Sequence, residues 1–211
     1  MRTGARPPWL HPAAKPLVFA LCALPCGWLL FAALTDGLGA NPAEALIRAT
    51  GDWTLRALCL VLAVTPLRVL TGTPALARFR RMFGLWVFCY AVLHFVCYAV
   101  LDQGLDVQTI LRDVVKRPFI LVGSLALVLL ALLAATSTQR AMRALGGRRW
   151  QALHRAVYAV AALALLHFFW MRAGKRNFAE VAVYALILGL LLGWRLGHAW
   201  WRRRRAAGGA N

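Results

Sequence analysis

The chain has 211 residues, of which 61% are hydrophobic and only 15% charged. This composition excludes a soluble globular domain built around one core and indicates an integral membrane protein. The formal net charge of +18 is distributed over loops and ends, and only Arg202–Arg205 forms a run. We therefore attribute the charge to membrane topology and expect no nucleic-acid binding.

Six apolar windows approach the length needed to cross the roughly 30 Å hydrocarbon core of a bilayer. They lie at Leu17–Leu34, Trp53–Leu70, Gly84–Leu101, Pro118–Ala135, Ala152–Trp170 and Ala179–Trp194. The sequence therefore predicts an all-α polytopic membrane protein, a six-transmembrane-helix bundle over residues 17–198. We expect residues 1–16 to form a cytoplasmic N-terminal segment and residues 199–211 a basic cytoplasmic tail.

The basic residues predict the orientation, because Lys and Arg collect in short loops on the cytoplasmic side. With both termini in the cytoplasm, the inner side holds 17 of the 25 basic residues. All seven acids then fall at or beyond the outer helix ends: Asp36, Glu44, Asp52, Asp102, Asp106, Asp113 and Glu180. No Ala-x-Ala-like cleavage site follows the first window, so we expect it to remain as a helix rather than act as a signal peptide.

The segments between the windows carry weaker patterns. Asn41-Pro42 in the outer loop Thr35–Asp52 favours a short interfacial helix over Ala43–Arg48. The outer segment Asp102–Arg117 has an amphipathic pattern that predicts a helix lying on the membrane surface. All five cysteines fall inside the windows, where we expect them to act as small apolar residues and to form no disulfide framework. The absence of a C-x-x-C-H motif excludes covalent haem attachment.

Three histidines lie inside the windows, where an ionisable group is costly and usually functional. His94 belongs to the third window, and His154 and His167 belong to the fifth. Both windows run from inside to outside, so His94 and His167 are expected in the same, outer half of the bilayer. Neutral imidazoles from facing helices are ordinary ligands of haem iron. We therefore predict that these two histidines bind one haem that is not covalently attached.

His154 presents a difficulty of spacing. Its thirteen-residue separation from His167 leaves the two side chains about 140° apart on an ideal helix, at about 100° per residue. Either the fifth helix departs from ideal geometry, or the two imidazoles serve different sites. A second haem lacks a histidine near Arg80, fourteen residues before His94. Hydrogen-bonded core groups or a proton relay are the alternatives for all three histidines.

Three segments resemble the MsrQ (YedZ) family of the ferric-reductase-like transmembrane superfamily: RRMFGLWVFCYAVLHFVCY at 80–98, KRPFILVG at 116–123 and LGGRRWQALHRAVYAVAALALLHFFW at 145–170. The resemblance implies a multi-pass cytochrome of the bacterial inner membrane that uses haem b and a flavin, FMN. It implies electron transfer to MsrP, a periplasmic molybdenum enzyme that reduces methionine sulfoxide in proteins. The family's haem histidines fall on His94, His154 and His167.

One departure from related families bears on His154. The oxidase relatives carry two histidines on each of the two helices, whereas this chain has one on the third, as in STEAP reductases, where flavin occupies the inner half. We therefore interpret His154 as an inner-site residue, either a ligand or a flavin neighbour. Arg80 and Arg81 in the inner basic rim are candidates to bind a flavin phosphate, with topology alone as the alternative explanation.

The sequence shows no G-x-G-x-x-G motif and no soluble dehydrogenase domain. Electrons are therefore expected from a separate cytoplasmic flavin reductase or from quinol in the membrane lipid. In this interpretation the chain is an electron-transfer subunit, and reduction of the substrate takes place in the partner. Two other classes stay open: a proton channel or transporter that uses a histidine relay, and an anchoring subunit without a redox role.

Overall fold

The computed structural model describes residues 11–174 and 178–208, and these ranges contain helices and no strands. Six helical segments are long and apolar enough to cross a membrane: Ala14–Leu34, Pro42–Leu70, Pro74–Asp102, Pro118–Ala135, Gly147–Ala173 and Ala179–Arg205. The predicted all-α, six-helix fold is confirmed. The chain is a multi-pass membrane protein.

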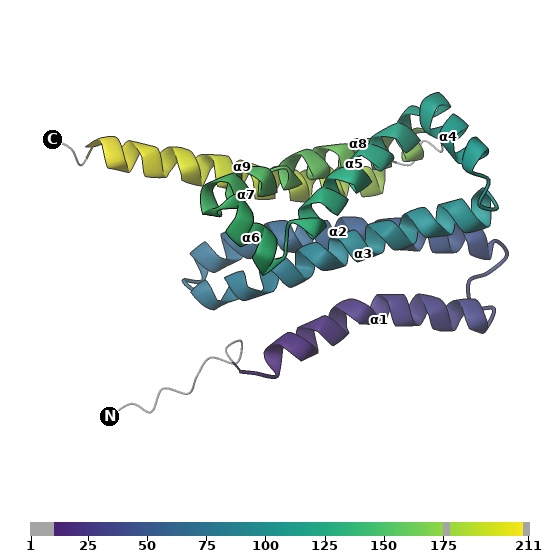
Figure 1. Ribbon diagram of the computed structural model, residues 1–211, viewed down its shortest axis with the longest axis horizontal. Coiled ribbons are helices and arrows are strands. Elements are labelled where there is room, and N and C mark those ends of the chain that lie inside the picture. The colour runs from purple at the N-terminus through teal and green to yellow at the C-terminus, as the bar shows by residue number, and fades with distance from the viewer. Residues whose placement is uncertain (1–10, 175–177, 209–211) are drawn as a thin grey trace.

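The spans are arranged as one bundle with two distinct ends (Figure 1). In chain order the elements are α1 (Ala14–Leu34), α2 (Pro42–Leu70), the 3₁₀-helix η2 (Pro74–Phe79), α3 (Arg80–Cys97), the π-helix η3 (Tyr98–Asp102), α4 (Val107–Lys116), α5 (Pro118–Ala135), α6 (Gln139–Leu145), α7 (Gly147–His154), α8 (Val157–Ala173) and α9 (Ala179–Gly208). We call the end that carries α6, where α1 begins and α9 finishes, the α6 end, and the opposite end the α4 end.

The predicted terminal segments overlap the described residues only in part. Residues 1–10 of the expected N-terminal segment and residues 209–211 of the expected tail lie outside the description. Helix α1 already begins at Ala14, and α9 continues to Gly208. The described part of the basic tail is therefore an extension of the last helix.

Helix α2 is longer than the sequence predicted. We expected a loop with a short helix up to Arg48, but α2 runs without a break from Pro42 to Leu70. The Asn41 side chain caps the helix by accepting the Glu44 N–H at 3.1 Å, and Pro42 occupies the first turn. The expected boundary was wrong because the polar residues in the first turns of α2 can face the cavity described below and therefore do not need to lie in a loop. The extension brings Ile47–Gly51 into the bundle.

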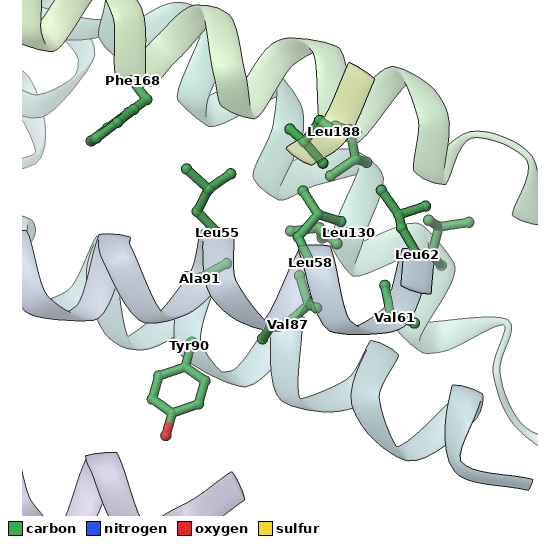
Figure 2. Close-up of a cluster of buried hydrophobic side chains, with 14 of the residues drawn as sticks. Leu55, Leu58, Val61, Leu62, Val87, Tyr90, Ala91, Leu130, Phe168 and Leu188 are labelled. Atoms are coloured by element: carbon green, nitrogen blue, oxygen red, sulfur yellow. The ribbon is translucent and has the colours of Figure 1, made fainter. Parts of the chain in front are cut away.

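The buried core joins five of the spans. Figure 2 shows its centre, where Leu58 and Leu62 of α2 meet Val87 of α3, Leu130 of α5 and Leu188 of α9. Among the helix pairs, α2 packs most extensively against α3, and α5 packs next most extensively against α8. Side chains from these four helices therefore surround the space between the two pairs.

Helix α1 lies at the edge of the bundle (Figure 1). Only Leu29 and Ala32 of this helix are buried. The Tyr90 hydroxyl of α3 donates to the Cys22 carbonyl oxygen at 2.7 Å and links α1 to the other helices. The rest of its apolar surface is suited to contact with lipid chains, which solvate apolar side chains as well as a protein core does.

The fifth apolar window is not one regular helix. Helix α7 ends at His154 and α8 begins at Val157, and around Arg155 and Ala156 the backbone hydrogen bonds span three residues instead of four. The fifth span therefore departs from ideal geometry, which was one of the two explanations that the spacing of its histidines left open. An angle calculated for a straight helix does not relate His154 to His167.

Helix α4 confirms the amphipathic helix predicted between the third and fourth spans. Asp106 caps it by accepting the backbone N–H groups of Gln108 and Thr109 at 2.9 and 3.2 Å. Leu111 and Val115 lie exposed on one face, whereas Asp113 on the other face is buried. The exposed apolar face fits a position at the membrane surface.

Candidate functional site

A cavity of about 620 Å³ lies among α2, α3, α5 and α8. Its deep part is lined by apolar side chains, including Leu58, Val87 and Val160. Charged side chains line the part nearest the α4 end: Glu44, Arg48, Asp52, Asp102 and Arg117. The volume lies in the range of about 300–1,000 Å³ that is usual for small-molecule and cofactor sites.

His94 and His167 both line this cavity and lie opposite each other, His94 on α3 and His167 on α8. Their ring centroids are 6.1 Å apart, and the ring planes are nearly perpendicular at 81°. Two imidazoles on opposite sides of one metal, each with a nitrogen about 2 Å from it, have centroids roughly 6 Å apart. The spacing therefore fits a single metal ion held between these two rings.

A backbone carbonyl fixes the tautomer of each ring. Nδ1 of His94 lies 2.8 Å from the Ile47 carbonyl oxygen, and Nδ1 of His167 lies 2.6 Å from that of Phe119. Because a carbonyl oxygen only accepts, Nδ1–H is the donor in both contacts. In the neutral imidazole, Nε2 then carries the lone pair that a metal requires.

The ligand set is limited to these two rings. In residues 11–174 and 178–208, no group of three or more His, Cys, Asp or Glu side chains is placed to hold a metal ion. A closed zinc site uses four protein ligands, whereas haem iron takes four of its ligands from the porphyrin and needs only the two axial ones from the protein. The donor set and the apolar cavity fit haem better than a protein-ligated metal ion.

Two arginines at the charged part of the cavity were not predicted as site residues. Arg48 pairs with Glu44 on α2 at 2.5 Å, and Arg117, just before α5, pairs with Asp113 of α4 at 3.3 Å. Both guanidinium groups could bind the carboxylates of a porphyrin. We had assigned Arg48 to an interfacial helix outside the bundle, so its position in the cavity lining could not be predicted.

His154 occupies a different place from the other two histidines. Its ring stacks on Trp150, with centroids 4.0 Å apart, and its Nε2 lies 3.3 Å from the Thr136 hydroxyl. The Trp150 indole N–H donates to the Thr136 carbonyl oxygen at 2.9 Å. His154 does not line the cavity that holds His94 and His167. The structure thus brings together two of the three predicted histidines.

The predicted basic residues Arg80 and Arg81 lie at the start of α3, at the α6 end. Arg80 donates to the Thr65 hydroxyl of α2 at 2.5 Å, and Arg81 is exposed. Arg195 of α9, which the sequence analysis did not single out, donates to the Tyr158 hydroxyl at 3.0 Å and to the Leu62 carbonyl at 2.5 Å. Basic side chains from α3 and α9 therefore anchor to neighbouring helices at this end.

Comparison with known proteins agrees with this architecture. Residues 50–165 match the family model described as ferric reductase like transmembrane component. No solved structure gives a significant match. The matched range includes His94 and His154 and ends two residues before His167.

Relatives of similar length match almost the whole chain. A protein of Polaromonas naphthalenivorans is 64% identical over 203 residues, which cover 96% of this chain and 93% of the relative. A protein of Bordetella pertussis is 55% identical (92% and 93% covered), and one of Ralstonia nicotianae is 50% identical (97% and 93% covered). All three are named protein-methionine-sulfoxide reductase heme-binding subunit MsrQ. This chain belongs to the MsrQ family, within the ferric-reductase-like transmembrane proteins.

Proposed function

We propose that this chain is a transmembrane b-type cytochrome that carries electrons to a protein-methionine-sulfoxide reductase. The observation that carries the proposal is the pair of opposed imidazoles, His94 and His167, whose Nδ1 atoms are anchored to carbonyls beside an apolar cavity. The names of the relatives, which describe haem-binding subunits of such a reductase, support it.

In this proposal the chain's own residues bind and orient one haem b. His94 and His167 would hold the haem iron through their Nε2 atoms, and Arg48 and Arg117 would bind the carboxylates of the porphyrin. The apolar lining from α2, α3, α5 and α8 excludes water and lowers the local dielectric constant. When bound, the haem supplies a one-electron couple of ferric and ferrous iron.

The proposed electron route runs from the α6 end to the α4 end. We place the α6 end in the cytoplasm because most basic residues gather there, and the α4 end in the periplasm. The donor is a cytoplasmic flavin reductase or quinol, and the acceptor is the molybdenum enzyme MsrP in the periplasm. FMN is the proposed inner cofactor: Arg80 and Arg81 would bind its phosphate, and His154 would be its neighbour.

The proton relay considered above finds less support. A relay through three histidines requires them to lie along one path, but His154 contacts Trp150 and Thr136 and lies outside the cavity lining. An absorption spectrum of the purified chain tests the proposal directly. We expect a Soret band that shifts on reduction with dithionite, at one haem per chain. A colourless protein from cells well supplied with haem would contradict the proposal.

A further inference from the structure

The two opposed histidines are held by the same local arrangement on two different helices. His94 donates to the carbonyl of Ile47 on α2, and His167 donates to that of Phe119 on α5. In both helices the residue four positions after this carbonyl is a glycine: Gly51 follows Ile47, and Gly123 follows Phe119. In an α-helix, that residue is the one whose N–H also points at the carbonyl.

A side chain at either glycine would occupy the position of the imidazole. A Cβ atom built on Gly123 would lie 2.7 Å from Nδ1 and 2.9 Å from Cε1 of His167. A Cβ atom on Gly51 would lie 3.1 Å from Cε1 and 3.2 Å from Nδ1 of His94. The distances from Gly123 are shorter than real Cβ contacts, and those from Gly51 are tight. Alanine at position 123 would therefore force the His167 ring to move, and alanine at position 51 would crowd the His94 ring.

The close approach explains why glycine stands inside these helices, where it is unfavourable relative to alanine. A carbonyl in a helix interior is surrounded by the side chains of the next turn, and a ring that shares it must pass over the residue four positions later. Without a Cβ at that residue, the imidazole reaches the carbonyl. By contrast, nothing lies within 4 Å of a Cβ built on Gly84 of α3 or Gly189 of α9.

We propose that Gly51 and Gly123 are positioning residues that let the Ile47 and Phe119 carbonyls fix the orientation and tautomer of the two haem-ligand imidazoles. The inference rests on the proposed function, because it assigns these glycines to the haem site. A hydrogen bond to Nδ1–H makes the imidazole a stronger electron donor to a metal. Loss of that bond should weaken haem binding and raise the reduction potential.

The two sides should respond unequally. At His94, the Thr50 hydroxyl lies 3.4 Å from Nδ1, and Thr50 is almost completely buried next to Gly51. A displaced His94 ring therefore has a second acceptor within reach. His167 has only the Phe119 carbonyl at its Nδ1 in the described hydrogen bonds. The Cβ distance is also shorter at Gly123 than at Gly51. Gly123→Ala should therefore weaken haem binding more than Gly51→Ala does.

The experiment compares Gly51→Ala and Gly123→Ala with the matched controls Gly84→Ala and Gly189→Ala. Haem per polypeptide, midpoint potential and the low-spin electron paramagnetic resonance spectrum are measured in purified protein. For Gly123→Ala we expect haem affinity about 10- to 100-fold weaker, the usual effect of losing an outer-shell partner. For Gly51→Ala we expect haem to be retained with a raised potential and an altered spectrum, and for the controls wild-type values.

Two further measurements separate positioning from folding and from haem binding itself. Thermal unfolding of haem-free protein should show that both alanine variants still unfold cooperatively, as the controls do. In haem-free protein with ¹⁵N-labelled histidine, the wild type should give protonated, hydrogen-bonded Nδ1 signals for His94 and His167, and each alanine variant should change one of them.

Two outcomes are distinguishable. If the wild type bound no haem, the proposed function would fail, and the histidine spectra would still decide whether the glycines position the rings. If Gly51→Ala and Gly123→Ala matched the controls in haem content, potential and histidine spectrum, the inference would be overturned while the haem proposal stood.

Discussion

At the scale of single residues, the proposed haem site makes the two opposed histidines one unit. Because the 6.1 Å between their ring centroids suits one shared metal, each ring would depend on the other for the same coordination in that site. His94 and His167 approach it from different helices and have separate carbonyl partners. Their contributions to haem binding should therefore not be additive.

This non-additivity is the first prediction. His94→Ala and His167→Ala should each abolish the same low-spin haem signal, and the double variant should be little worse than either single variant. Haem content and absorption spectra of the three proteins check it. Two spectrally distinct haems, each lost in a different single variant, would show that the histidines belong to separate sites.

The arginines beside the cavity give a second prediction at this scale. A nearby cation favours the reduced haem, which carries one more negative charge, so removal of the cation should lower the reduction potential. We expect Arg48→Gln and Arg117→Gln each to lower the reduction potential by the equivalent of roughly 1 kcal/mol. This is the interaction energy between the added electron and a partly solvated charge about 10 Å away.

Potentiometric titration of the haem band measures this effect. Arg112→Gln is the control, because Arg112 of α4 is exposed and does not line the cavity. An equal shift in the control would attribute the effect to overall charge and not to contact with the cofactor.

At the scale of helices, regular apolar segments were predictable and interruptions were not. Pro118–Ala135 was predicted to the residue, since apolar side chains cover all its faces between a proline and a polar turn. The start of α2 was missed because Glu44, Arg48 and Asp52 lower its hydropathy, although they line the cavity. The break after His154 has no proline or glycine to signal it, and only the histidine spacing pointed to a departure from ideal geometry.

The same limits apply to the site. The two histidines were predictable because ionisable groups are conspicuous in an apolar window. Thr50 and Gly51 were not, because the predicted loop placed them outside the bundle. Gly123 lies in the window Pro118–Ala135, for which the sequence suggested no functional residue. A glycine inside a helix that otherwise favours large apolar residues was the available signal, and only the structure shows which ring it accommodates.

Helix α4 provides the third prediction, which concerns pH. The Thr109 hydroxyl and the backbone N–H groups of Thr109 and Gln108 donate to Asp106 and hold the pKa of that carboxyl below its ordinary value. The stabilisation is therefore present above the ordinary carboxylate pKa and is lost as pH falls through the depressed value. The first turn of α4 should fray only in acid.

Hydrogen exchange of the α4 amides as a function of pH measures this fraying. Asp106→Asn keeps a good capping side chain but removes the titrating group. The protection of its first-turn amides, relative to unprotected amides at the same pH, should therefore stay constant across the acid range. If the asparagine variant frayed with the wild-type pH profile, another group would be responsible.

At the scale of the whole molecule, the proposed electron route must reach the opposed histidines from the α6 end. His94 lies 20 positions after the start of its span at Pro74 and 8 before its end at Asp102, and His167 lies 20 after Gly147 and 6 before Ala173. At about 1.5 Å per residue, the fourteen positions of α3 from Arg80 to His94 alone span roughly 20 Å. A second redox group is needed within this distance.

The fourth prediction places that group near His154. His154→Ala should leave the spectrum of the haem bound by His94 and His167 intact but stop its reduction by a cytoplasmic flavin donor, whereas dithionite should still reduce it. Stopped-flow reduction in oriented vesicles compares the two reductants. Wild-type kinetics with both would remove His154 from the route and leave it as a residue that packs against Trp150 and Thr136.

The off-centre position of the histidine pair has an electrical consequence. The membrane potential falls across the whole hydrocarbon layer, at about 2.3 kcal/mol per elementary charge for each 100 mV. An electron that travels from the α6 end to His94 and His167 crosses most of this drop, and one that leaves towards the α4 end crosses little of it. With the α6 end in the cytoplasm, a negative-inside potential should accelerate reduction of the haem and leave its oxidation by the partner nearly insensitive to voltage.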